Sequence, residues 1–175
     1  MKRLAMVGAP LIFAAAMTLS GARAARAEVP DPKDAAKDAA VINSCLAKVR
    51  KTDSAPEKYE AACLLKVADP CMGDDPASAS DRRQIECLDR ERLVWDKIIN
   101  DSYKSVMNAI EPDQAKKLRE VQKAWIHSRD VTCEFFYDYF QGSMAYPMIA
   151  SCNNRETARR ALYLWTFAID VSERK

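Results

Sequence analysis

An unusual set of polar and aromatic side chains lies between Leu118 and Cys133. The segment reads Leu-x3-Gln-x2-Trp-x3-Arg-Asp-x2-Cys, so Gln122, Trp125 and Arg129 follow one another at steps of three and four residues. Such steps place side chains on one face of an α-helix. A guanidinium four residues after an indole can lie over the ring as a cation–π pair, which contributes about 0.5–1 kcal/mol when exposed. This face therefore requires a specific partner surface.

Further polar residues could join this face to neighbouring helices. We expect Asp130 to accept hydrogen bonds from Arg160 as a bidentate pair that fixes the register of two helices. We also expect Gln122, Asn100 and Thr157 to close a polar network between helices. Two interpretations stay open at this point. Either all of these residues are scaffold, or some of them form a surface groove for a partner.

Residue combinations typical of enzymes are weak in this chain. His127 is the only histidine, and although Ser128 adjoins it, no acid stands at a convincing triad spacing. Glu134 and Asp138 are four residues apart on one helix face, a spacing that more often marks a solvated face than a catalytic carboxylate pair. The motifs of zinc proteases, phosphate-binding loops and serine hydrolases are absent from the sequence. We expect a non-catalytic protein without a cofactor.

All six cysteines lie after residue 27. An even number of cysteines behind a signal peptide indicates disulfides formed in an oxidising compartment. We predict nearest-neighbour pairing, in which each disulfide closes a loop of roughly 15–20 residues and contributes about 3 kcal/mol. A metal site is the alternative, but the chain has one histidine and no Cys-x2-Cys, so we expect no metal. The predicted pairs are Cys45–Cys63, Cys71–Cys87 and Cys133–Cys152.

Residues 1–27 have the pattern of a secretory signal peptide. Lys2 and Arg3 precede an apolar run from Leu4 to Leu19, and small residues then lead to a predicted cleavage after Ala27. An uncleaved anchor is the alternative, but the run is shorter than the roughly 20 residues that span a membrane. No cysteine lies near the cleavage site for lipid attachment. We therefore predict a periplasmic or secreted protein with no membrane anchor after cleavage.

The charge of the chain changes when the signal peptide is removed. Residues 1–27 hold four basic and no acidic residues, so the 27 basic residues fall to 23 against 25 acidic residues. The remaining 148 residues carry a net charge of −2 and are long enough for one domain with a core. Nucleic-acid binding would need a basic patch, which this balance does not favour.

Helical periodicity runs through most of the chain, and we find no convincing strand alternation. Ser54 and Ser80 are predicted N-caps, Pro112 suits a first helical turn, and residues 141–143 form a break. We predict an all-α fold, a small antiparallel helical bundle stapled by disulfides, with an N-terminal helical hairpin extension at residues 28–70 and a main domain at 71–175. The predicted helices cover residues 35–51, 56–67, 81–110, 112–139, and a last helix that starts between 143 and 154 and ends near 171; residues 69–76 are predicted as a loop.

Four motifs read together carry a family resemblance. They are Ile99-Asn100-x2-Tyr103, the Leu118–Cys133 block, Gly142-Ser143, and Cys152-x4-Thr157-x2-Arg160-x3-Leu164. Their order and spacing resemble the LprI-like lysozyme inhibitor N-terminal domain family over about residues 71–164. The resemblance implies a small exported helical domain with paired cysteines, and a binding protein that inhibits lysozyme. The family-motif residues are Asn100, Tyr103, Gln122, Trp125, Arg129, Asp130, Thr157 and Arg160.

Two segments could bind a lysozyme if the resemblance extends to function. The acidic segment Asp69–Asp81, with Asp74 and Asp75, suits a cationic enzyme, and the segment Phe140–Ser151 offers Met144, Tyr146 and Met148 as anchors. We predict both segments to be loops. The partner is then lysozyme or another envelope protein. The alternative function is a structural or protein-interaction module of the cell envelope, with a partner site on the N-terminal hairpin and no lysozyme activity.

Overall fold

The computed structural model describes residues 31–52 and 56–174, and within these ranges the fold is all helical. The predicted signal peptide and the predicted cap Ser54 lie outside the described residues. The elements in chain order are α1 (Pro32–Thr52), α2 (Pro56–Cys63), α3 (Ala68–Met72), the 3-10 turn η1 (Pro76–Ser78), α4 (Asp81–Met107), α5 (Pro112–Phe140) and α6 (Ala145–Glu173).

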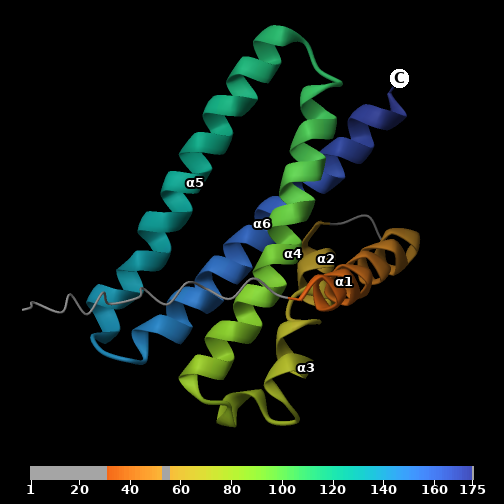
Figure 1. Cartoon of the computed structure of the whole chain (residues 1–175). Coiled ribbons are helices and arrows are strands. Elements are labelled where there is room, and N and C mark those ends of the chain that lie inside the picture. The colour runs from red at the N-terminus through yellow and green to blue at the C-terminus, as the bar shows by residue number, and fades with distance from the viewer. Residues whose placement is uncertain (1–30, 53–55, 175) are drawn as a thin grey trace, which may run out of the picture.

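Three long helices form the body of the molecule. Figure 1 shows that α4, α5 and α6 alternate in direction, and that α4 and α6 cross each other along much of their length. The helix α5 packs on α6 and stands away from α4, while α1 and α2 cover the other side of α4 and α6. The predicted all-α bundle is confirmed.

Local capping signals explain where two of the long helices begin. The Ser80 hydroxyl accepts a hydrogen bond from the Arg83 N–H at 3.3 Å, as expected of an N-cap before α4. Pro112 occupies the first turn of α5, and the N–H of Glu111 donates to the side-chain oxygen of Gln114 at 3.1 Å. Both predicted helix starts are confirmed. The helix α4 ends at Met107, three residues before the predicted end.

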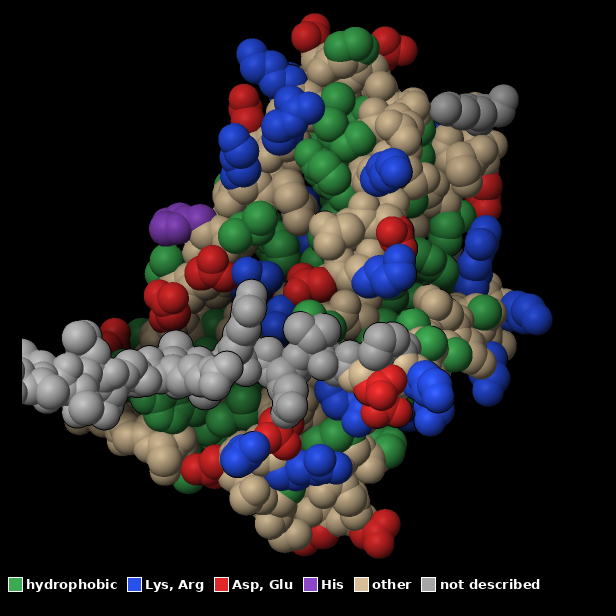
Figure 2. Space-filling model, viewed as in Figure 1, with side chains coloured by type: hydrophobic (Ala, Val, Ile, Leu, Met, Phe, Trp, Pro, Cys, Tyr) green, Lys and Arg blue, Asp and Glu red, His purple; other side chains and the backbone are tan. Residues whose placement is uncertain are grey.

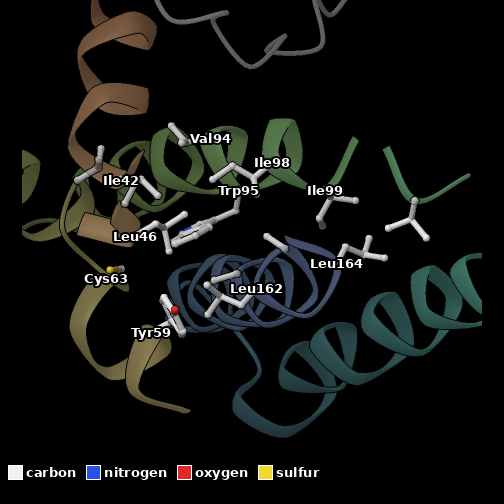
Figure 3. Close-up of a cluster of buried hydrophobic side chains, with 14 of the residues drawn as sticks. Ile42, Leu46, Tyr59, Cys63, Val94, Trp95, Ile98, Ile99, Leu162 and Leu164 are labelled. Carbon is white, nitrogen blue, oxygen red and sulfur yellow. The ribbon is translucent and has the colours of Figure 1, made fainter. Parts of the chain in front are cut away.

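The main hydrophobic core lies where α1, α2, α4 and α6 meet. Trp95 of α4 is fully buried at its centre, with Leu46 of α1, Tyr59 of α2 and Leu162 of α6 around it (Figure 3). Burial of such side chains contributes about 1.5–3 kcal/mol each. The α1–α2 hairpin therefore shares one core with the long helices.

Three disulfides join neighbouring helices in the pairing that the sequence predicts. Cys45–Cys63 connects α1 to α2, Cys71–Cys87 connects α3 to α4, and Cys133–Cys152 connects α5 to α6. The Cα atoms of each pair lie 5.5–5.7 Å apart, which is an ordinary disulfide separation. No cysteine in the described residues is free.

A corner between α2 and α3 replaces the single helix that the sequence predicts for residues 56–67. The helix α2 ends at Cys63, and Leu65 adopts a positive φ of 66°. The carboxylate of Glu91 on α4 accepts hydrogen bonds from the backbone N–H groups of Leu65, Val67 and Ala68, at 2.8, 2.9 and 3.0 Å. These bonds satisfy amides that a continuous helix would pair internally, so the predicted helix end is wrong.

The same corner changes the interpretation of the acidic segment that follows. We predicted a loop over residues 69–76, but residues 69–72 belong to α3, and Pro76 begins η1. The short helix is possible because Glu91 accepts the N–H groups at its start, and because Pro70 lies in its first turn, where a missing N–H costs little. Of the predicted loop, only residues 73–75 therefore lie outside a helix.

Glu91 has further partners within the core. Its side chain is fully buried, and the carboxylate also accepts from the indole Nε1 of Trp95 and from Nδ2 of Asn154 on α6, both at 3.1 Å. A buried carboxylate is costly unless its lone pairs are satisfied. Here a single acid on α4 ties together the α2–α3 corner, the central tryptophan and α6.

Candidate partner-binding surface

Trp125 and two arginines stack where α5 meets α6. The guanidinium carbon of Arg129 lies 5.0 Å from the centroid of the Trp125 ring, and that of Arg160 lies 5.7 Å from it. Arg160 also lies 5.1 Å from the ring centroid of Tyr163. The predicted cation–π pair of Trp125 and Arg129 is confirmed. We call Gln122, Trp125, Arg129, Arg160 and Tyr163 the arginine–tryptophan cluster.

Hydrogen bonds around the cluster differ from those predicted. Arg160 Nε donates to Gln122 Oε1 at 2.8 Å, whereas Arg129 donates from Nε and Nη2 to Asp130 Oδ1, at 3.0 and 2.8 Å. The predicted pair of Asp130 with Arg160 is wrong. Asp130 directly follows Arg129 in sequence, so this neighbouring guanidinium reaches it, while Arg160 pairs with Gln122, just over two helical turns before Asp130 on α5.

The predicted network of Gln122, Asn100 and Thr157 does not form. Asn100 is exposed on α4, and Thr157 is fully buried in α6, where its hydroxyl has no hydrogen-bond partner in the structure. The side-chain oxygen of Gln122 instead accepts from Arg160, which lies three residues after Thr157 on α6 and is half-buried rather than fully buried. Tyr103, the remaining motif residue of α4, is half-buried and packs against the main core.

Charges from α4 approach the cluster from the other side. Arg92 Nη1 donates to Asp96 Oδ2 at 2.7 Å, and Arg129 of α5 also lowers the pKa of Asp96. Burial has the larger effect, so the pKa of Asp96 is raised overall. Burial also lowers the pKa of Arg160. Figure 2 shows basic and acidic side chains next to one another on this face, between α5 and α4. The effect of Arg129 on Asp96 is thus an electrostatic attraction between α5 and α4.

Aromatic side chains gather at the end of the α5–α6 hairpin, over residues 135–146, which we call the hairpin tip. Phe136 stacks on Phe140 at a centroid distance of 5.9 Å, and Tyr137 of α5 meets Tyr146 of α6 at 6.0 Å. Tyr146 remains 53% exposed, and Met144 remains 61% exposed. Exposed aromatic groups on a preformed hairpin are typical of protein-binding surfaces.

The turn in the hairpin tip is shorter than predicted. We expected a loop over residues 140–151, but α6 begins at Ala145, so only residues 141–144 lie between the helices. The N–H of Ala145 donates to the carbonyl of Gly142, and the N–H of Tyr146 donates to that of Ser143, both at 3.2 Å. These bonds begin the helix directly after the turn. Tyr146 and Met148 therefore project from a helix rather than from a loop.

Gln141 carries backbone strain in this turn, with φ of 48° next to Gly142 with φ of 110°. We expect Gln141→Gly to raise the free energy of unfolding by about 1 kcal/mol, because glycine adopts positive φ without a Cβ clash. Urea unfolding of both proteins measures the difference. Gly142→Ala is the matched control and should destabilise, since open space around Gly142 leaves only the backbone conformation at stake. Equal stability of wild type and Gln141→Gly would contradict the strain.

The acidic residues lie at the same end of the bundle as the hairpin tip. Asp74 and Asp75 are exposed in the loop between α3 and η1. This loop adjoins the start of α4, and the beginning of α6 packs there too, through contact of Ala150 with Leu88 and Ala68. The carbonyl of Cys71, at the base of the loop, accepts from Arg83 Nε at 3.0 Å. An acidic loop and an aromatic tip are thus presented together.

The comparison with protein families identifies the family of this chain. A family model described as lysozyme inhibitor LprI matches residues 71–164, more than half of the chain. The chain belongs to the LprI lysozyme inhibitor family. No curated protein and no solved structure matches the chain significantly.

The LprI match covers the main surface features described above. It starts at Cys71 and ends at Leu164, and it includes the acidic loop, the arginine–tryptophan cluster, the hairpin tip and two disulfides. The helices α1 and α2 lie outside it. A family of inhibitors fits a non-catalytic protein. Of the eight motif residues, the structure brings Gln122, Trp125, Arg129 and Arg160 together, with Asp130 beside them, and places Asn100, Tyr103 and Thr157 elsewhere.

Within residues 31–52 and 56–174, no group of three or more His, Cys, Asp or Glu side chains could hold a metal ion. None of the helices described is both long and apolar enough to cross a membrane. His127, Glu134 and Asp138 are exposed on α5, as expected of a solvated helix face.

Proposed function

We propose that this chain is an exported lysozyme inhibitor whose hairpin tip binds in the substrate cleft of the enzyme. The family match supports lysozyme as the partner. The observation that carries the choice of surface is the exposure of Met144 and Tyr146 on a hairpin that the Cys133–Cys152 disulfide closes.

The chemistry of lysozyme makes occlusion sufficient for inhibition. A glycosidase hydrolyses its substrate with two carboxyl groups that flank the scissile bond in an open cleft. An inhibitor therefore needs only to fill the cleft and exclude the sugar chain. Rigid aromatic anchors suit this role because few rotatable bonds lose freedom on binding. In the hairpin tip, the Tyr137–Tyr146 contact and the short turn hold the anchors before the partner arrives.

The position of the acidic loop also supports binding of lysozyme at the hairpin tip. Asp74 and Asp75 are exposed at the end of the bundle that carries the hairpin tip. Opposite charge accelerates encounter more than it strengthens the final complex. We infer that these carboxylates steer a cationic lysozyme towards the tip, so their contribution should fall as salt rises.

The compartment follows from the same reasoning. Three disulfides favour an oxidising environment, and this supports our proposal that the chain is located in the periplasm or outside the cell. We propose that residues 1–27 are the signal peptide, that residues 28–70 are an added hairpin, and that residues 71–175 are the inhibitory domain. The N-terminal hairpin would then serve stability through the shared core.

A titration of lysozymes with the oxidised protein of residues 28–175 tests the proposal. We expect saturable inhibition of cell-wall lysis, and an inhibition constant about thirtyfold higher for Tyr146→Ala, because buried aromatic anchors commonly contribute about 2 kcal/mol. The double variant Asp74→Ala with Asp75→Ala should lose affinity mainly at low salt. Leu93→Ala, which truncates an exposed apolar residue of α4, is the control and should inhibit like wild type.

Two results would count against the proposal. Unchanged inhibition by Tyr146→Ala and by the double variant would remove this end of the bundle as the binding surface. No inhibition of any lysozyme type would reject the inhibitor and favour an envelope-interaction module with another partner.

A further inference from the structure

The helix α5 has a second organised face besides the one that packs on α6. Its residues follow one another at steps of three or four, and all are exposed; four of them are large, with exposures between 50% and 69%. At 3.6 residues per turn, this face lies roughly 100° around the helix from the face that holds Trp125 and Cys133. We call it the outer seam: Val121, Ala124, Ser128, Val131, Phe135 and Tyr139.

We propose that the outer seam is a homodimer interface, in which α5 of a second copy packs against it in antiparallel orientation. The steps from Val121 to Phe135 match the alternating three- and four-residue spacing of a coiled-coil seam over two heptads. One face of α5 packs within the fold, and the outer seam is a second apolar face that is exposed to water. Exposed apolar patches of this kind mark surfaces that bind another protein.

Side-chain sizes along the seam fit an antiparallel partner. In one antiparallel register, Ala124 lies opposite Phe135 of the second copy, and Ser128 lies opposite Val131 of the second copy. Each small residue then faces a larger one, as close packing between helices requires. The pairing repeats by symmetry, because the same surface serves both copies.

The distribution of charge along α5 also favours the antiparallel orientation. The exposed residues of the first half of α5 are mainly basic, whereas Glu134 and Asp138 make the second half acidic. Antiparallel packing brings the basic half of one copy beside the acidic half of the other, while parallel packing would place like charges together. The basic residues are Lys116, Lys117, Arg119 and Lys123, with Asp113 and Glu120 among them. Lys117 lies four residues before Val121 and is therefore in line with the seam.

The seam shares Phe135 and Tyr139 with the hairpin tip but includes neither Met144 nor Tyr146, the anchors proposed for lysozyme. Tyr137 contacts Tyr146 on the side of α5 opposite the seam, so a dimer leaves these two side chains accessible. A single helix pair is smaller than the interfaces of about 1,200 Å² or more that stable complexes bury. We therefore expect a dissociation constant on the order of micromolar. The inference goes beyond the proposed function, because dimer formation and inhibition are measured independently.

Sedimentation velocity of the oxidised protein of residues 28–175, across a concentration series around the micromolar range, tests the dimer. We expect wild type to shift from monomer to dimer, and Val131→Glu to raise the dissociation constant at least about tenfold, by placing a charge in an apolar interface. Ile126→Glu is the matched control, since Ile126 is 41% exposed on the opposite side of α5, and it should dimerise like wild type. Unchanged helicity and unchanged urea unfolding show that both variants fold, whether or not the chain inhibits lysozyme.

A charge exchange tests the orientation. Lys117→Glu should weaken the dimer, and the double variant Lys117→Glu with Asp138→Lys should restore it, because the charges at both ends of the seam reverse sign together. Three results would overturn the inference: a wild-type monomer throughout the series, a dimer lost with Ile126→Glu but kept with Val131→Glu, or a double variant weaker than the single one.

Discussion

Glu91→Ala is expected to lower the free energy of unfolding by about 4 kcal/mol or more, a large part of the stability of an ordinary domain. The carboxylate accepts five hydrogen bonds inside the core, three of them from backbone N–H groups at the α2–α3 corner. Removing it leaves several buried donors without partners, and each such donor costs about 1–3 kcal/mol. It also opens a cavity beside Trp95.

Urea unfolding of the oxidised proteins, followed by circular dichroism, measures this loss. Glu91→Gln should fall between wild type and Glu91→Ala, because the amide keeps the shape but turns one acceptor oxygen into a donor. Glu86→Ala is the matched control on the same helix, since Glu86 pairs only with Arg82 at the surface in the structure described, and such pairs contribute about 0–1 kcal/mol. A loss below about 1 kcal/mol for Glu91→Ala would mean that water or a rearranged corner satisfies the donors.

Removal of the Cys133–Cys152 disulfide is expected to affect both stability and inhibition. Replacing both cysteines by serine should lower the free energy of unfolding by about 3 kcal/mol, since the bond closes a segment with a sequence separation of 19 residues. The helix α5 buries only Leu118 and Cys133, so this bond is a principal attachment of the hairpin tip. A more flexible tip loses more conformational entropy when it binds, which should raise the inhibition constant.

The Cys45–Cys63 disulfide provides the comparison. It closes a segment of similar length, with a separation of 18 residues, but joins α1 to α2, away from the hairpin tip. Its double serine variant should lose similar stability and, at temperatures where both variants are folded, keep full inhibition of lysozyme. If the two variants inhibited equally well, the tip would not depend on its disulfide for binding.

Much of the fold can be predicted from short-range signals. Ser80 and Pro112 mark helix starts because their effects act within one helical turn, and the structure has both starts as predicted. Nearest-neighbour disulfides follow from cysteines 16–19 residues apart, since two helices joined by a short turn return the chain over that distance. The cation–π pair of Trp125 and Arg129 is also local.

The incorrect predictions involve competition between distant groups. The break after Cys63 depends on Glu91, which lies 26 residues after Leu65 and could not be assigned to that corner from sequence alone. A signal was present, because Glu91 lies between Leu88 and Trp95 at helical spacing, and an acid in an apolar stripe indicates a buried polar partner.

The arginine–tryptophan cluster gives a second example. Both Arg129 and Arg160 could have paired with Asp130, and helix periodicity alone does not decide between them. The structure pairs Asp130 with its sequence neighbour and leaves Arg160 to Gln122. Which donor reaches which acceptor depends on rotamers and on the crossing of α5 and α6, and neither can be read from residue spacing.

The shallow attachment of α5 has a consequence for motion. Nine residues of α4 and nine of α6 are buried, against two of α5. Amide protons of α4 and α6 should therefore exchange with solvent only on global unfolding, whereas those of α5 exchange through a smaller opening of that helix alone. The disulfide at one end and the turn before Pro112 at the other keep the opened helix tethered. The outer seam and much of the hairpin tip thus lie on the segment of the bundle that can adjust its position at the lowest free energy.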